Sequence, residues 1–120
     1  MYLTLPLLDP APLQSLYALP GGPEAVLELI GIVEEDVPMR LNLIREFLAE
    51  RRFKDAGIEA HSIKGGAGNM GLRRFADVAR LLEFRLRDEE APDCEDLLAA
   101  LEAIYPPSLE ALKQAFPAEA

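Results

Sequence analysis

The amino-acid sequence predicts an all-α fold, namely an antiparallel up-and-down four-helix bundle with a short N-terminal capping helix. Apolar residues recur at spacings of three and four over most of the 120 residues, as in amphipathic helices. No segment shows sustained two-residue alternation, and β-branched residues are few. Short connections between the four main segments favour antiparallel neighbours. We expect one domain over residues 1–120, with residues 1–23 as a lid or cap and residues 24–116 as the bundle.

The first 23 residues contain five of the ten prolines and suit a cap better than a core element. Within them, DPAPLQSLYALPGG predicts a short helix. Asp9 can cap this helix, Pro10 suits its first position, and Gly21-Gly22 can end it.

A long helical segment follows, from Pro23 to about Glu50. Proline inside a helix removes a hydrogen bond, so Pro38 predicts a kink or a division there. The apolar positions that should face the core are Leu27, Ile30, Val37, Leu41, Ile44 and Leu48.

Two further amphipathic helices should lie on either side of a bend at Gly71, and a last helix should begin near Asp93. Pro106-Pro107 should kink or divide the last helix. The stripe before the bend is Ala56, Ala60, Ile63, Ala67 and Met70, and the stripe after it is Leu72, Phe75, Ala79, Leu82 and Leu86.

Composition excludes several classes of protein. A single cysteine, Cys94, allows neither an intramolecular disulfide nor a cysteine-based metal site. No run of eighteen apolar residues is present, and the N-terminus does not resemble a signal peptide. We therefore expect a cytoplasmic protein that does not bind membranes. The net charge of −9 argues against a nucleic-acid partner.

The charge is unevenly distributed along the chain. Residues 1–50 carry 8 acids and 2 bases, residues 51–87 carry 4 acids and 9 bases, and residues 88–120 carry 9 acids and 1 base. The basic middle zone contains the only histidine, His61. Its arginines either solvate the surface or create a field that favours an acidic partner.

The stretch AHSIKGGAGNMG, residues 60–71, combines that histidine with four glycines. GAGNMG matches a dinucleotide-binding fingerprint, but that motif needs a preceding strand, and the residues before it have helical character. A phosphate-binding P-loop also fails, because its lysine follows the glycines, whereas Lys64 precedes them.

On a helix, His61 projects roughly 140° from the centre of the apolar stripe. Gly65 and Gly68 then lie on the histidine's own face, and Lys64 can bring its ammonium beside the imidazole. Glycines 65, 66 and 68 together cost a helix on the order of 3 kcal/mol relative to alanine. The imidazole should therefore stand in solvent beside bare backbone, where a second macromolecule can approach closely.

A neutral imidazole is a good nucleophile near pH 7 and can hold a phosphoryl group as a labile phosphoramidate. A neighbouring lysine offsets the added negative charge. Glu59 should project toward another face, so an acid/base hydrolase is poorly supported. One histidine without a cysteine cluster also gives little support to a metal site.

HSIKGGAGNMG resembles the signature of histidine-containing phosphotransfer (HPt) domains, in which histidine is followed by lysine three, glycine four and glycine ten residues later. His61, Lys64, Gly65 and Gly71 occupy these positions. The lead-in helix, the segment around DVP and the LRRFADVARLLE stretch are also similar, so the resemblance covers most of the chain.

The resemblance implies a two-component phosphorelay intermediate without autonomous ATP-dependent activity. His61 would accept a phosphoryl group on Nε2 from a receiver-domain aspartate and pass it to another receiver, while Lys64 would stabilise the phosphoryl oxygens. Ile58, Gly65, Gly68 and Asn69 are candidate docking residues. Partners would be response-regulator receiver domains and a sensor histidine kinase. The chain needs no cofactor, since the receiver would bring Mg²⁺, and we expect a monomer.

Some alternatives remain open. The chain is also consistent with the phosphoacceptor domain of a larger hybrid or chemotaxis-type histidine kinase, or with a non-catalytic helical adaptor. Ile58 is either a docking residue or covered by the N-terminal segment. Arg73 and Arg74 either touch the partner or solvate the start of their helix, and we favour the second.

Overall fold

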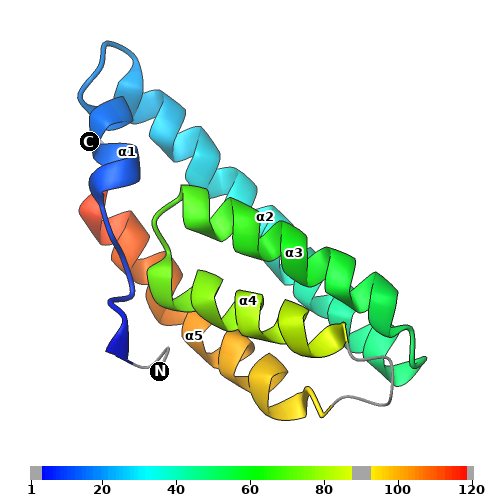
Figure 1. Cartoon of the computed structure of the whole chain (residues 1–120). Coiled ribbons are helices and arrows are strands. Elements are labelled where there is room, and N and C mark those ends of the chain that lie inside the picture. The colour runs from blue at the N-terminus through cyan, green and yellow to red at the C-terminus, as the bar shows by residue number, and fades with distance from the viewer. Residues whose placement is uncertain (1–3, 88–92, 119–120) are drawn as a thin grey trace.

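The computed structural model describes residues 4–87 and 93–118, which form five α-helices and no strand (Figure 1). Helices α2 to α5 run alternately up and down around one apolar core, and α1 packs against α2 near the end where α2 begins. The predicted all-α bundle with a capping helix is confirmed. The helices are α1 Ala11–Tyr17, α2 Gly22–Ala49, α3 Phe53–Asn69, α4 Arg73–Leu86 and α5 Glu95–Ala115.

The core is built around the two stripes that the sequence predicts on either side of Gly71. All ten residues of these stripes are at most 5% exposed. Three of the five residues in the stripe before Gly71 are alanines, whose small side chains let α3 pack closely against both α2 and α4. On α2, four of the six predicted positions are buried, and Leu27 and Leu48 are half-buried.

The prolines interrupt neither long helix. Helix α2 continues through Pro38, and α5 continues through Pro106-Pro107, so the predicted alternative of a division at these positions is wrong. A proline inside a helix costs about 3 kcal/mol or more. Tertiary packing offsets this cost, since Val37 and Leu41 beside Pro38 are both buried in the core.

Gly71 ends the connection from α3 and fixes the path of the N-terminal segment. Its φ of 81° lies in the left-handed region that favours glycine. The Asp9 N–H donates to the Gly71 carbonyl over 2.8 Å, and a Cβ at Gly71 would collide with the carbonyl oxygen of Asp9. This glycine is therefore required both by the turn and by the close approach of two backbones.

Arg74 holds the same N-terminal segment against the start of α4. Its backbone N–H donates to the Pro6 carbonyl over 3.2 Å, and its Nε donates to the Leu5 carbonyl over 2.8 Å. Arg73 lies nearby, 3.9 Å from the carboxylate of Asp9. The prediction that the arginine only solvates the start of the helix is therefore wrong for Arg74.

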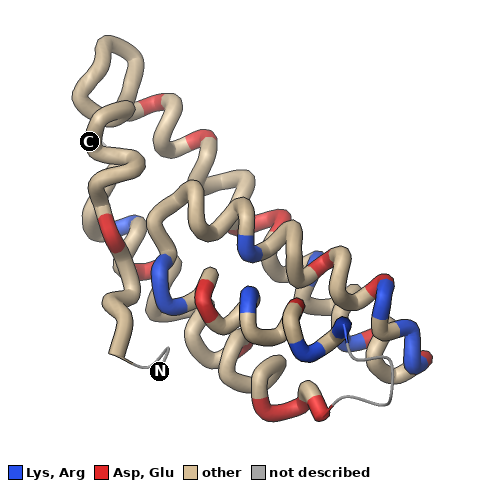
Figure 2. The backbone as a smooth tube through the Cα atoms, in the orientation of Figure 1, with Lys and Arg blue, Asp and Glu red and all other residues tan. Residues whose placement is uncertain are grey.

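Charged residues follow the zones seen in the sequence. Figure 2 shows Lys and Arg gathered on α3, α4 and the connection between α2 and α3. Ion pairs join α2 to α5, where Lys113 Nζ lies 3.0 Å from Glu34 and Arg45 pairs with Glu102. The basic zone of residues 51–87 spans α3, which carries His61, and α4.

Among the described residues, none of the helices combines the length and the apolar character that crossing a membrane requires.

Candidate functional site

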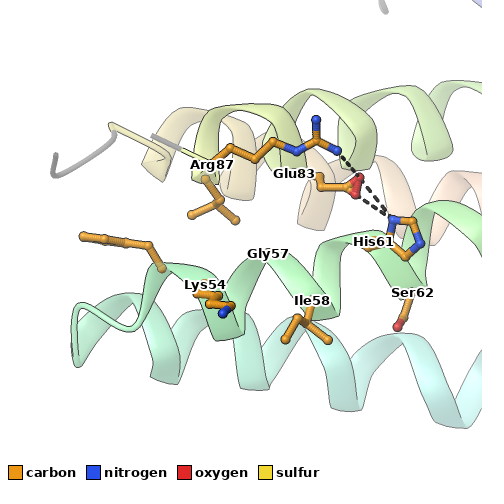
Figure 3. Close-up of a pocket in the computed structure, with 9 residues that line it drawn as sticks. Lys54, Gly57, Ile58, His61, Ser62, Glu83 and Arg87 are labelled. Carbon is orange, nitrogen blue, oxygen red and sulfur yellow. Dashed lines mark hydrogen bonds and ion pairs between the residues drawn. The ribbon is translucent and has the colours of Figure 1, made fainter. Parts of the chain in front are cut away.

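His61 lies near the middle of α3 and points away from the core, with 68% of its side chain exposed. Its Nδ1 lies 2.8 Å from Oε2 and 3.2 Å from Oε1 of Glu83, a residue of α4. Figure 3 shows one ring nitrogen turned toward this carboxylate and the other turned away from it. The ring is therefore held at one nitrogen, and the other has no hydrogen-bond partner among the described residues.

Glu83 is a buried carboxylate, with 8% of its side chain exposed. Burial alone raises the pKa of Glu83, but hydrogen bonds from His61 and Lys64, together with their charges, lower that pKa below its ordinary value of 4.5. Glu83 is thus ionised at neutral pH and can only accept hydrogen bonds. The hydrogen between the two residues therefore sits on Nδ1, which leaves the lone pair of a neutral ring on Nε2.

Lys64 reaches the same carboxylate from α3. Its Nζ lies 3.2 Å from Oε1 of Glu83, and Nη2 of Arg87 lies 3.6 Å from that oxygen. The sequence predicts the Lys64 ammonium beside the imidazole. In the structure, the two groups are brought together by the carboxylate that they share.

Gly65 and Gly68 extend the exposed face of α3 beyond His61. A Cβ placed on either residue would have no neighbour within 4 Å, and the same holds for Gly66. Helix packing therefore does not require glycine at these three positions. The surface beside the imidazole is bare backbone, as the helical interpretation predicts.

Ile58 and Asn69 lie on different sides of the exposed face. Ile58, one turn before His61, is 54% exposed, so the alternative that the N-terminal segment covers it is wrong. Asn69 lines a hollow of about 190 Å³ between α2 and α3, and His61 does not line that hollow. The structure thus places Ile58, Gly65 and Gly68 along the histidine's face and Asn69 beside it.

Sequence reasoning missed Glu83. It considered only Glu59, which instead accepts a hydrogen bond from Arg40 of α2 over 2.9 Å. The available signal was the position of Glu83, four residues after Ala79 and directly after Leu82, on the edge of the predicted apolar stripe. A carboxylate at the edge of a core face needs a partner, and the neighbouring helix supplies two.

No group of three or more potential metal-ligating side chains comes together within residues 4–87 and 93–118. The candidate site consists of the His61 imidazole, the Glu83 carboxylate and two cationic side chains, those of Lys64 and Arg87.

Comparison with known protein families gives one match. The family model for the Hpt domain covers residues 28–118, well over half of the chain. Comparisons with curated proteins and with solved structures gave no significant match. Hpt domains interact with receiver domains and kinases. The chain belongs to the Hpt domain family, whose members carry out histidine phosphotransfer in two-component signalling.

Proposed function

We propose that His61 is the phosphoacceptor of a multistep phosphorelay, and that it takes its phosphoryl group from a receiver-domain aspartate and passes it to a second receiver. One observation carries this proposal. Glu83 holds Nδ1 as a hydrogen-bond donor, while Nε2 faces outward on a side chain that is 68% exposed. Nε2 thus carries the lone pair that attacks phosphorus and is accessible to a partner.

The transfer follows from this arrangement. The Nε2 lone pair attacks the phosphorus of the aspartyl phosphate, the bond from phosphorus to the carboxylate oxygen breaks, and aspartate leaves as a carboxylate. Nδ1 keeps its hydrogen, so the phosphorylated ring carries a positive charge. Glu83 offsets that charge, because a hydrogen bond to a charged group contributes about 1.5–3 kcal/mol. The same steps in reverse load the second receiver.

Lys64 and the glycines support the transfer in different ways. The Lys64 ammonium, next to Glu83, adds positive charge where the phosphoryl oxygens arrive. Gly65 and Gly68 leave room for the receiver surface, which would bring Mg²⁺ with its own aspartate. We expect Lys64→Ala to slow transfer without abolishing it, and an unchanged rate would remove Lys64 from the mechanism.

The test uses the receiver domains of the source organism, each labelled with a small phosphodonor such as acetyl phosphate. The wild-type chain should acquire acid-labile, base-stable label from at least one of them. His61→Gln should acquire none, while circular dichroism shows the same helicity. Label that persists in the folded variant would exclude His61 as the acceptor.

Two further incubations separate the alternatives. ATP alone should not label the chain, and label under that condition would overturn the proposal. Faster labelling by an ATP-binding kinase domain than by any receiver would favour the acceptor domain of a larger kinase. No labelling by either donor would favour the adaptor with an incidental histidine.

A further inference from the structure

A groove of about 410 Å³ runs between the first half of α3 and the last half of α4, and His61 and Glu83 lie at one end of it (Figure 3). We call it the α3–α4 groove. Its other principal lining residues are Phe53, Lys54, Gly57, Ile58, Leu86 and Arg87.

The groove is apolar within and cationic at its rim. Phe53 and Ile58 supply apolar surface, and Ile58 is 54% exposed although it is a large aliphatic residue. Lys54 and Arg87 are both exposed at the surface. No acidic side chain among the described residues lies within ion-pair distance of the Lys54 ammonium.

Gly57 keeps this groove open. It lies inside α3, where glycine is unfavourable relative to alanine. A Cβ at this position would meet only Leu86 Cβ at 3.7 Å, which is an ordinary van der Waals contact. Packing between α3 and α4 therefore does not require glycine here. A larger side chain at position 57 would extend into the groove.

The position of the groove identifies its occupant. Lys54, Ile58 and His61 are spaced by four and three residues, so they share one face of α3. Because His61 forms part of the groove wall, a protein that places its aspartyl phosphate on Nε2 covers at least this end of the groove. The basic zone of residues 51–87, with nine bases and four acids, favours an acidic surface on that protein.

We propose that the α3–α4 groove receives an apolar side chain of the receiver domain that exchanges phosphoryl groups with His61, with a receiver carboxylate beside it pairing with Lys54. This inference rests on the proposed function. Burial of one large apolar side chain contributes roughly 10- to 100-fold in affinity. The groove would thus determine which receivers the chain accepts.

Gly57→Leu tests the groove, and Gly31→Leu is its matched control. Gly31 is also a helical glycine with no neighbour within 4 Å of an added Cβ, but it lies on the exposed surface of α2, outside the groove. We expect Gly57→Leu to weaken binding of the beryllofluoride-activated receiver at least tenfold, measured by calorimetry. Gly31→Leu should leave it unchanged. If both variants bind the receiver with equal affinity, the groove proposal is overturned. The proposed function still stands in that case, provided that the receiver still transfers its phosphoryl group to His61.

Chemical phosphorylation by phosphoramidate reports on His61 without any docking partner. Gly57→Leu should be labelled at the wild-type rate. Slower labelling would mean that Gly57→Leu disturbs His61 itself. The groove is then tested with Ile58→Ser, because that substitution removes apolar surface without filling the groove. Tenfold weaker receiver binding by Ile58→Ser supports the proposal, and unchanged binding refutes it.

Lys54→Glu tests the acidic flank, with Arg85→Glu as the control for general electrostatic attraction. Arg85 is exposed on α4 and donates to the Asp93 carbonyl, outside the groove. Lys54→Glu should weaken receiver binding several-fold more than Arg85→Glu at low salt, and the difference should shrink as salt rises. If Lys54→Glu and Arg85→Glu weakened receiver binding equally, the proposed pairing of a receiver carboxylate with Lys54 would be wrong. A wild-type chain that accepts no phosphoryl group from any receiver would instead refute the proposed function, and the groove assignment with it.

Discussion

The two faces of α3 differ in almost every property. The inward face consists of Ala56, Ala60, Ile63 and Ala67, none more than 3% exposed. The outward face runs through Ile58, His61, Gly65 and Gly68, where a charged neighbour or bare backbone replaces packing. One helix thus separates two tasks. Its inner side packs in the core of the bundle, whereas much of its outer side is exposed to solvent.

The largest expected difference between the faces is in stability. Ile63→Ala should lower the free energy of unfolding by about 2–5 kcal/mol, because it leaves a cavity in the core. Ile58→Ala, the same change on the exposed face, should lower it by no more than about 0.5 kcal/mol. Urea unfolding followed by circular dichroism measures both. Similar losses would show that the outer face also supports the fold.

The next largest effect concerns Glu83, the carboxylate of α4 that contacts His61 and Lys64 on the outer face of α3. Glu83→Gln should slow transfer from the receiver roughly tenfold, or about 1.4 kcal/mol, because the amide carries no charge to hold Nδ1–H. Nitrogen NMR of the only histidine should show the Nδ1–H form in the wild type and a mixture of tautomers in the variant.

Glu59→Gln is the matched control for that change. Glu59 also lies on α3 and accepts a hydrogen bond, but its donor is Arg40. The rate of transfer and the imidazole tautomer should both stay as in the wild type. If Glu59→Gln slowed transfer as much as Glu83→Gln, a general charge effect would explain both results.

A smaller effect is expected where the outer face is bare backbone. Gly68→Leu should raise the free energy of unfolding by up to about 0.8 kcal/mol, since leucine favours helix and nothing obstructs its Cβ. The same variant should bind the receiver more weakly, because its side chain occupies the approach to His61. A variant that loses stability and binding together would make Gly68 a structural residue.

The smallest effect should appear in the pH dependence of stability. The pKa of Glu83 is lower in the folded chain than its ordinary value of 4.5, so ionised Glu83 stabilises the fold above that pH. This contribution is lost as pH falls through the folded pKa. The stability of the wild type relative to Glu83→Gln should therefore decline below about pH 4.5. Parallel profiles down to pH 3, measured by urea unfolding, would contradict the pKa shift.

The parts of the fold that the sequence predicts well are those with local periodicity. The alanine-rich stripe of α3 and the leucine-rich stripe of α4 follow from spacing alone, and both are buried as predicted. The position of His61 opposite the first stripe follows from the same geometry. The prolines were misjudged because a local rule counts the lost hydrogen bond and omits the tertiary packing on either side of it.

Contacts between distant segments were beyond the sequence. Arg74 binds carbonyls nearly seventy residues earlier in the chain, and nothing in its local pattern distinguishes it from a solvated arginine. Glu83 is twenty-two residues from His61, so their contact depends on how α3 and α4 pack. The exposed position of His61 was therefore predictable, whereas the carboxylate that contacts its Nδ1 was not.

The contact between Glu83 and His61 has a consequence for protein engineering. The imidazole and its carboxylate come from different helices, so the tautomer depends on the register of α4 against α3. A slip of one helical turn, about 5.4 Å, would move the carboxylate out of reach. Grafting the histidine, lysine and glycines onto another helical scaffold would copy the motif but not its chemistry, unless the second helix is transplanted in the same alignment.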